Sequence, residues 1–414
     1  MLDRTKAEPE QVWRGQESLT QKYYTSQAVY DVDITMIMDG QWLLAGHAAQ
    51  LQKRGDYFLF EVGVESVIVT RDSPDTIRAF YNVCRHRGSR ICSKPAGSTR
   101  TLTCPYHAWS WNLDGTMRGA PEMGPEFRKE NYSLHEVHVG LFEGIIFLNF
   151  SKGEPPSFSN FASRFSDLVE PHQLSKTKVA YRKSYPTTAN WKLVVENFLE
   201  CYHCGPSHPT YCSVHSKLKL KGFIGGRQVG SNEALSAFEP LLLEWQEKAS
   251  AMGHYTGRFT DDSESDHLQQ GVRTPYLTDA LTESRDGKLV APFLGTFTQS
   301  DGASTYAVFS PLNSALINAD YAILVSFVPR SVNHTDVECI WLVNETAREG
   351  EDYDVERLID VWNTTLTEDK KIVEDNQLGV SSSMYTPGPH SYMEARVTSV
   401  LGWYLKHYEK YAGK

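Results

Sequence analysis

The sequence predicts an α+β protein with two domains, an all-β first domain and a second domain that combines a sheet with helices. The 414 residues exceed the roughly 100–200 residues of a typical single domain. Between residues 40 and 152, short runs of β-branched and aromatic residues are bounded by Gly, Asp, Ser or Pro, a pattern typical of strands joined by turns. After residue 152, strand-like runs alternate with helical periodicity.

The composition is that of a globular protein, with 40% hydrophobic and 22% charged residues. The formal net charge of −10 argues against a nucleic-acid partner and weakly favours cationic ligands, although many cytosolic enzymes are acidic. The opening MLDRTKAEPEQVWRGQ has no apolar run, and no stretch approaches the roughly 18 apolar residues of a membrane span. Seven irregularly spaced cysteines do not suggest a disulfide framework. We therefore expect a cytoplasmic protein.

The expected elements follow the chain in order. Residues 1–39 are polar and partly helical, and we expect them to pack on the second domain. The first domain, 40–152, holds the strand-like runs at 57–63, 66–72, 76–83 and 141–150. The segment 151–159 is the best linker, because Pro155-Pro156 continues neither helix nor strand. The second domain, 153–414, holds a helical pattern at 190–204, strands at 305–330 and 337–346, and helices at 352–377 and 391–411; the intervening 225–300 is expected to be loop-rich and to face a substrate.

Two Cys-His pairs form the first group of candidate metal ligands. Cys84-x-His86 and Cys104-x-x-His107 are separated by 17 residues. A zinc finger commonly places two Cys on one arm and two His on the other, whereas here each arm offers one of each. That arrangement suits a [2Fe–2S] cluster in which one iron takes two thiolates and the other takes two imidazoles, which raises the reduction potential. Zinc and a chance pairing are the alternatives on spacing alone.

The flanking residues agree with a cluster site. Gly88, Gly97 and Pro105 supply turn geometry that lets backbone N–H groups approach the sulfur atoms. Cys92 lies out of register between the arms, and we expect it to be a buried free thiol.

A second group of candidate ligands lies in ENFLECYHCGPSHPTY. Helical spacing places Glu200 and His203 on one face, and a break at Gly205-Pro206 would turn His208 back toward His203. Two imidazoles and one distant carboxylate would form a facial triad for ferrous iron. Two histidines at this spacing are, however, often incidental. Cys201 and Cys204 form a C-x-x-C that could indicate thiol redox chemistry, but no thioredoxin-like βαβ setting surrounds it.

The third ligand would be a carboxylate from TEDKKIVEDNQ, which offers Glu368, Asp369, Glu374 and Asp375. At about 100° per residue, Asp369 falls within the apolar stripe of this helix, whereas Asp375 lies off it. A carboxylate on a core-facing stripe is costly unless it is paired or bound to metal. We therefore expect Asp369 to be the ligand, with Asp375 as the second choice.

The two Cys-His arms, CRHRG and CPYHAWSW, resemble the cluster motif of Rieske non-haem iron oxygenases. The resemblance extends over nearly the whole chain, including DNQLGVSSSMYTPGP. It implies an all-β Rieske [2Fe–2S] domain at 40–152 and a catalytic mononuclear iron domain at 153–414, with an antiparallel sheet covered by helices in a helix-grip-like arrangement. The cluster would be held by Cys84, His86, Cys104 and His107.

The resemblance also assigns the second site. The family pattern N-x(5)-H-x(4)-H, with an acidic residue three before the first His, maps onto Asn197, Glu200, His203 and His208, and the family's E-D segment places the third iron ligand at Asp369. Asn197 and Glu200 would be catalytic. Many members have Asp where this chain has Glu200, and Glu is a feature of the branch that acts on carnitine-like substrates.

The implied activity is that of the branch acting on quaternary ammonium compounds. Such an oxygenase uses O₂ and electrons from an NAD(P)H-dependent flavin/ferredoxin-type reductase to hydroxylate an N-methyl group of a substrate such as glycine betaine or proline betaine, which releases formaldehyde. The family forms homotrimers, in which Glu200 would bridge His107 of one chain to His203 of the next. The alternatives are an aromatic-ring hydroxylase or O-demethylase on the same scaffold, or an electron carrier, which would need no second site. A quaternary ammonium favours aromatic faces, but no cage residue can be named from the sequence.

Overall fold

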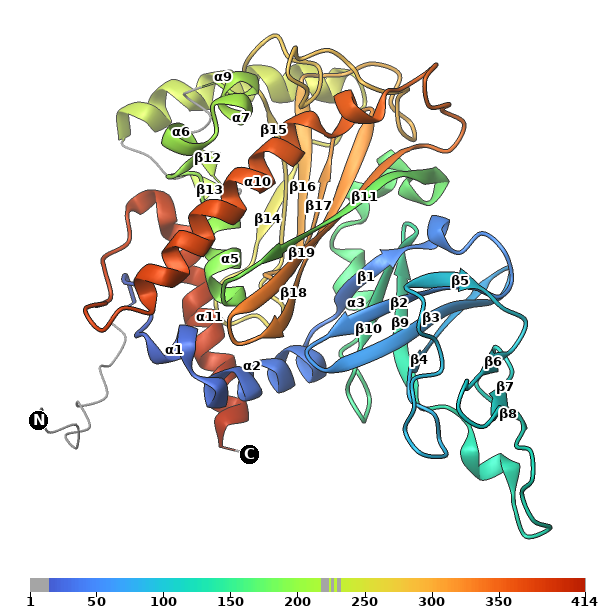
Figure 1. The fold of residues 1–414 in the computed structure, drawn as a ribbon. Helices are drawn as coiled ribbons and strands as arrows, with labels where there is room; N and C mark the ends of the chain where they lie inside the picture. Colours follow the sequence, from blue (N-terminus) through green and yellow to red (C-terminus); the bar gives the residue numbers. More distant parts are fainter. Residues whose placement is uncertain (1–14, 217–222, 225–226, 229–231, 414) are drawn as a thin grey trace, which may run out of the picture.

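The computed structural model describes residues 15–216, 223–224, 227–228 and 232–413. Two antiparallel seven-stranded sheets organise the chain, one in each half (Figure 1). The first sheet has the order β1 (Leu43–His47), β10 (Ile145–Asn149), β9 (Glu136–Phe142), β4 (Thr76–Tyr81), β3 (Glu65–Ser73), β2 (Asp56–Val62) and β5 (Ala96–Ser98). The second has the order β11 (Thr177–Thr187), β19 (His334–Asn344), β18 (Tyr321–Ser331), β17 (Asn313–Ile317), β16 (Ala303–Ser310), β15 (Gln270–Pro275) and β14 (Arg258–Thr260).

The first half contains the strands expected from the sequence. The run at 141–150 is a hairpin, because Glu143 and Gly144 both adopt positive φ values of 48° and 79° between β9 and β10. A small sheet of β6 (Leu102–Thr103), β7 (Ser110–Trp111) and β8 (Met117–Gly119) extends from the end of this half that lies away from the second sheet (Figure 1). Its core packs around Trp109 and Trp111, which are both buried.

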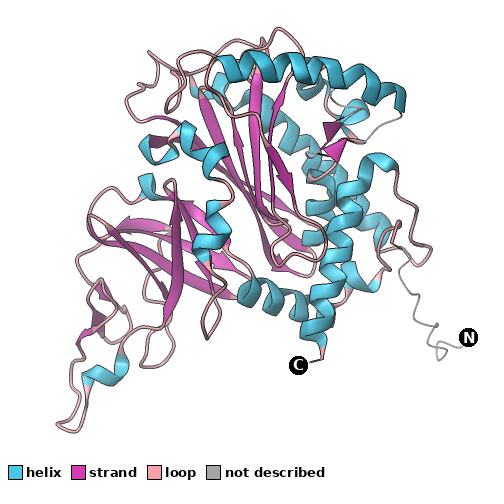
Figure 2. Cartoon of the chain, turned by 180° about the vertical axis from the view of Figure 1, so that it is seen from behind, coloured by secondary structure: helices cyan, strands magenta, loops and turns pink. Residues whose placement is uncertain are grey.

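Helices cover the second sheet on one face (Figure 2). The longest is α10 (Val355–Val380), which crosses the sheet and packs on β11, α5 (Trp191–Phe198) and α7 (Pro209–Val214). The other α-helices in the described residues are α1 (Lys22–Thr25), α2 (Gln27–Gly40), α3 (Phe158–Ser163), α4 (Ser166–Val169), α6 (Cys204–Ser207), α9 (Asn232–Ala251) and α11 (Ala395–Ala412). A two-stranded sheet joins β12 (Phe223–Ile224) and β13 (Arg227–Gln228). Among the helices that the structure describes, none combines the length and apolar character that crossing a bilayer requires.

The expectation that 225–300 is loop-rich is wrong for α9. Phe238, Leu242, Trp245 and Ala249 recur at helical spacing and are buried together against Val272 and Ala303. The polar composition of the segment and the internal Pro240 obscured this stripe in the sequence. Between β15 and β16 the chain is irregular, as expected.

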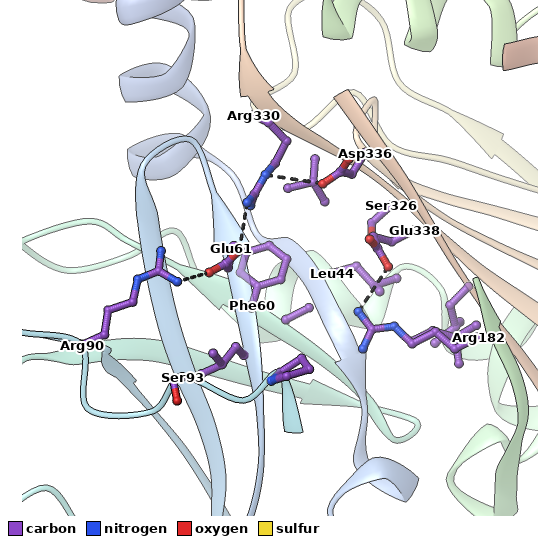
Figure 3. A pocket seen from close by; sticks show the side chains of 16 residues that line it. Leu44, Phe60, Glu61, Arg90, Ser93, Arg182, Ser326, Arg330, Asp336 and Glu338 are labelled. Atoms are coloured by element: carbon purple, nitrogen blue, oxygen red, sulfur yellow. Dashed lines mark hydrogen bonds and ion pairs between the residues drawn. The ribbon is translucent and has the colours of Figure 1, made fainter. Parts of the chain in front are cut away.

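Ion pairs, one of which joins the two sheets, line a cavity of about 390 Å³ (Figure 3). Glu61 on β2 accepts from Arg90 at 2.6 Å and from Arg330 on β18 at 2.9 Å. Arg182 on β11 contacts Glu338 on β19 at 3.2 Å. Because Glu61 and Arg330 come from different sheets, their ion pair fixes the first half of the chain against the second.

A buried ion pair ties the N-terminal helix to the centre of the second half. Asp33 on α2 contacts the Lys192 ammonium on α5, and both side chains are at most 2% exposed. Trp191 and Tyr404 donate hydrogen bonds to the same carboxylate at 3.0 and 2.7 Å. Burial lowers the pKa of Lys192, an effect that the charge of Asp33 opposes. Asp33 therefore joins α2, α5 and α11 in one network.

We predict that Asp33→Ala lowers the free energy of unfolding by about 3–5 kcal/mol, because it leaves the buried Lys192 charge without a counter-charge. Denaturant or thermal unfolding would measure this loss. The double variant Asp33→Ala/Lys192→Met should recover a large part of it. An equal loss in the single and double variants would contradict the account.

Candidate functional site

The two Cys-His arms fold into matching loops. Cys84 and Cys104 each accept a backbone hydrogen bond from the residue four positions later, Gly88 at 3.0 Å and Ala108 at 3.1 Å. Each also donates to the carbonyl five positions later, at 2.8 Å in both loops. Gly88 and Ala108 have φ values of 78° and 58°, so both loops turn through the left-handed region. The sequence therefore produces two equivalent turns, each presenting one Cys and one His.

These loops place sulfur inside and imidazole outside. Cys84 and Cys104 are buried, whereas His86 and His107 are exposed, with ring centroids 4.7 Å apart. Trp109 stacks on His86 at 4.7 Å. Burial raises the pKa of the Cys84 thiol, and the backbone N–H groups of His86 and Arg87 oppose this by donating to the sulfur. Two buried sulfur donors, one of which receives backbone N–H bonds, next to two outward imidazoles fit the donor set of a mixed-ligand [2Fe–2S] cluster.

Cys92, Pro105 and Gly97 are the other residues of interest near the two Cys-His loops. Cys92 is a buried free thiol, which confirms that expectation. Pro105 lies within the second loop, but Gly97 lies in β5 rather than in either loop. Gly97 therefore does not shape the turns as predicted.

The helix expected at 190–204 ends at Phe198, earlier than the predicted break at Gly205-Pro206. The cause is the Glu200 carboxylate, which accepts the backbone N–H groups of Tyr202 and, at 3.3 Å, His203. A side chain that captures backbone donors in this way competes with the helical hydrogen bonds. Gly205 and Pro206 instead lie in the first turn of α6, where proline is tolerated.

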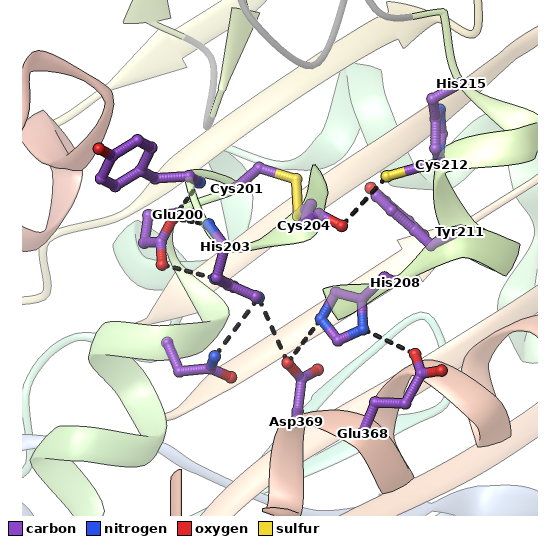
Figure 4. Close-up of a disulfide and its surroundings, with 12 residues drawn as sticks. Glu200, Cys201, His203, Cys204, His208, Tyr211, Cys212, His215, Glu368 and Asp369 are labelled. Carbon is purple, nitrogen blue, oxygen red and sulfur yellow. Dashed lines mark hydrogen bonds and ion pairs between the residues drawn. A yellow bond between two sulfur atoms is a disulfide. The ribbon is translucent and has the colours of Figure 1, made fainter. Parts of the chain in front are cut away.

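The resulting turns bring the second set of predicted residues together (Figure 4). The Asp369 Oδ1 atom lies 3.3 Å from His203 Nε2 and 2.9 Å from His208 Nε2. The potential ligand atoms of these three residues all lie within 4.8 Å of one another. Asn197 Nδ2 lies 3.4 Å from His203 Nε2. Two imidazoles and one carboxylate converging on a single point are the donor set of a facial-triad metal site.

The structure does not bring the second-choice carboxylate into this site. Asp375 is 63% exposed and pairs with Lys371 at 2.7 Å. Glu374 accepts the backbone N–H of Thr188 at 2.9 Å and pairs with Lys370. Asp369 lies on the same face of α10 as the buried Trp362, Leu366 and Val373, as its place on the apolar stripe predicts.

Hydrogen bonds set the charge state of this group. Although burial lowers the pKa of His203, hydrogen bonds to Asp369 and Glu200 raise it to about 9. The pKa of His208 is also raised, because hydrogen bonds to Asp369 and Glu368 outweigh burial. Burial alone would raise the pKa of Asp369. The two imidazoles lower it by a larger amount, so the pKa of Asp369 is below its usual value. A metal ion would replace the protons that these groups share.

Cys201 and Cys204 are joined by a disulfide bond in the structure. The bond closes the turn that carries Glu200 and His203 (Figure 4). Cys212, a free thiol, donates to the Cys204 carbonyl oxygen at 3.2 Å. The Cys201–Cys204 disulfide thus constrains the turn that carries His203. The described elements around it do not form a βαβ unit.

A buried carboxylate surrounded by rings lies beside this site and was missed in the sequence. Glu283 is 2% exposed and accepts from Tyr306 Oη and Trp362 Nε1, both at 2.9 Å. His215 Nε2 lies 3.3 Å from it. Tyr211 packs on His215 and Trp362 with centroids 4.4 and 5.5 Å apart. We call Glu283, Tyr211, His215, Tyr306 and Trp362 the Glu283 group.

The Glu283 group adjoins the His203–His208–Asp369 site along two elements. Tyr211 follows His208 by three residues, and Trp362 precedes Asp369 by seven on α10, about two helical turns or roughly 10 Å. Burial raises the pKa of Tyr211, and the charges of Glu283 and Asp369 add to this effect. No local motif could have revealed the group, because its members come from four separate parts of the chain.

Comparison with known families identifies both halves. A model described as "Ring hydroxylating alpha subunit (catalytic domain)" matches residues 174–410, and one described as "Rieske [2Fe-2S] domain" matches residues 41–138. The chain therefore belongs to the Rieske-type ring-hydroxylating oxygenase alpha subunits. It is an oxygenase subunit, and the cofactors of this family are a Rieske [2Fe–2S] cluster and a mononuclear iron, with O₂ as co-substrate.

Individual relatives and solved structures show which proteins of this family the chain is similar to. The chain is 33% identical over 394 residues to a glycine betaine monooxygenase oxygenase subunit of Pseudomonas aeruginosa (strain UCBPP-PA14), covering 94% of this chain and 88% of the relative. It is 31% identical over 208 residues to a carnitine monooxygenase oxygenase subunit of Escherichia coli (strain K12), covering 50% and 54%. In fold it resembles a quaternary ammonium Rieske monooxygenase, with a TM-score of 0.70, 21% identity and 95% coverage of both chains. Naphthalene 1,2-dioxygenase from Rhodococcus sp. follows with a TM-score of 0.68, 15% identity and 94% coverage of both.

We predict that the two sites lose metal independently. Asp369→Asn or His208→Ala should remove the mononuclear iron and leave the visible absorption of the [2Fe–2S] cluster unchanged, whereas Cys84→Ser should remove that absorption. Iron and acid-labile sulfide analysis after anaerobic reconstitution would measure both losses. Asp375→Asn is the matched control on the same helix and should retain all the iron. Loss of the mononuclear iron in this control would contradict the ligand assignment.

Proposed function

We propose that this chain is the oxygenase component of a monooxygenase that hydroxylates an N-methyl group of a quaternary ammonium compound such as glycine betaine or proline betaine. The observation that carries the proposal is the Glu283 group beside the His203–His208–Asp369 site. A quaternary ammonium has no N–H to donate, so it is recognised by aromatic faces and by a nearby negative charge. The 33% identity to a glycine betaine monooxygenase over 94% of the chain supports the same substrate class.

In this proposal, the mononuclear iron is held by His203, His208 and Asp369, and the cluster by Cys84, His86, Cys104 and His107. The cluster supplies single electrons, and the ferrous ion supplies open positions for O₂. Overall, one N–CH₃ group, O₂, two electrons and two protons give N–CH₂OH and water. The hemiaminal then collapses to the demethylated amine, formaldehyde and a proton.

Side chains of this chain orient the metal-binding imidazoles and place a negative charge near the site. The Glu200 and Glu368 carboxylates accept hydrogen bonds from the Nδ1 atoms of His203 and His208, which leaves both Nε2 atoms toward Asp369. The Glu283 carboxylate provides negative charge in a buried setting, where it attracts a cation more strongly than it would in water. An aromatic-ring hydroxylase or O-demethylase is the second reading of the scaffold, but an apolar ring gains nothing from a buried carboxylate.

We further propose that electrons come from an NAD(P)H-dependent flavin/ferredoxin-type reductase in the cytoplasm and that the working form is a homotrimer. The small β6–β8 sheet, which carries the second cluster loop, lies at the far end of the chain from α5 and α10 (Figure 1). Electron transfer within one chain would therefore have to cover a long path. A neighbouring chain would bring its His107 to Glu200, whose side chain already contacts His203 Nδ1 at 2.5 Å.

Formaldehyde release tests the substrate class. With a suitable reductase, we expect stoichiometric formaldehyde from glycine betaine or proline betaine and none from benzoates. The neutral carbon isostere 3,3-dimethylbutanoate, which lacks the positive charge, should compete weakly. Turnover confined to the benzoates would overturn the proposed substrate.

Glu200→Gln tests the electron path. We expect this variant to keep both the cluster absorption and the mononuclear iron and to lose turnover, because an amide cannot replace the carboxylate as the acceptor of two imidazole N–H groups. Rapid mixing of the reduced protein with O₂ and substrate would measure the rate of cluster oxidation. A variant with full activity would contradict the bridge.

A further inference from the structure

Two consecutive residues of α10 contact opposite nitrogen atoms of one imidazole. Glu368 Oε2 lies 2.8 Å from His208 Nδ1, and Asp369 Oδ1 lies 2.9 Å from His208 Nε2 (Figure 4). Neighbouring residues on a helix point about 100° apart, so their carboxylates can approach one ring from two sides. His208 is 1% exposed, and its ring is therefore held by these two contacts in a packed setting.

The contact with Glu368 gives Nδ1 of His208 a fixed acceptor. An ionised carboxylate accepts a hydrogen bond and cannot donate one, so Glu368 accepts at Nδ1, just as Asp369 accepts at Nε2. A metal ion that takes the place of the Nε2 proton would leave the Nδ1–H bonded to Glu368, with the Nε2 lone pair toward the metal. This is the tautomer that a metal ion between His208 and Asp369 requires.

His203 also contacts a carboxylate through Nδ1, but that carboxylate comes from a different part of the chain. Its Nδ1 atom lies 2.5 Å from Glu200 Oε1, a residue of its own turn. Glu368 instead acts across 160 residues, from the helix that also supplies Asp369. The position of His208 relative to Asp369 is thereby fixed from one rigid element.

We propose that Glu368 is a positioning residue for the mononuclear iron, which holds His208 in the Nδ1–H tautomer with its Nε2 atom toward the metal. The proposal rests on the ligand set given under the proposed function. It separates the two carboxylates by role: Glu200 lies on the electron path, whereas Glu368 sets the affinity and orientation of the metal site.

Metal binding tests this role without substrate turnover. The protein keeps its [2Fe–2S] cluster, the mononuclear iron is removed by chelation, and the affinity for Co²⁺ is measured anaerobically by calorimetry. Loss of such a carboxylate partner typically weakens metal binding about 10–100-fold, and we expect this for Glu368→Ala. Glu368→Gln retains an oxygen acceptor for the Nδ1–H and should lie between Glu368→Ala and the wild type. Asp375→Asn, an exposed carboxylate on the same helix, should bind Co²⁺ as the wild type does.

A second readout distinguishes positioning from a general structural effect. The visible spectrum of bound Co²⁺ should change in Glu368→Ala, while the cluster absorption and the melting temperature of the protein stay the same. Affinity within twofold of the wild type in Glu368→Ala would overturn the proposal, as would an equal loss in Asp375→Asn. Formaldehyde release by the wild type is measured separately, so failure of the proposed substrate and failure of the Glu368 role give different results.

Discussion

The site depends on one shared carboxylate. Asp369 lies between the Nε2 atoms of His203 and His208, and a carboxylate so placed would be costly without partners. Three separate constraints bring the groups together: the break after α5, the turn that ends at His208, and the inward face of α10. Because each constraint acts on a different part of the chain, a shift in any one of them separates the donors.

The remainder of the fold holds these constraints in place. The buried Asp33–Lys192 pair and its Trp191 and Tyr404 donors fix α5 from both ends of the chain. The ion pair between Glu61 and Arg330 sets the first sheet against the second. The chain thus holds its two candidate metal sites at a fixed separation.

The sequence predicts those parts of the site whose residues lie close together along the chain. Spacing marks the Cys84–His86 and Cys104–His107 arms locally, and the apolar stripe of α10 marks Asp369. Spacing alone leaves the His203–His208 pair ambiguous, and the family resemblance assigns it. The end of α5 was placed too late, because a side-chain interaction of Glu200 decides it. The stripe of α9 was hidden by polar neighbours and Pro240. The Glu368–His208 contact and the Glu283 group join residues far apart in sequence, and no single-sequence pattern encodes such pairs.

The most direct test is a crystal structure of the anaerobically reconstituted protein with an anomalous difference map collected at the iron edge. The account predicts one strong peak bounded by His203 Nε2, His208 Nε2 and the Asp369 carboxylate, and a second, elongated peak between the Cys84–His86 and Cys104–His107 loops. A map without the first peak, or with iron bound to Nδ1 of His208, would contradict it.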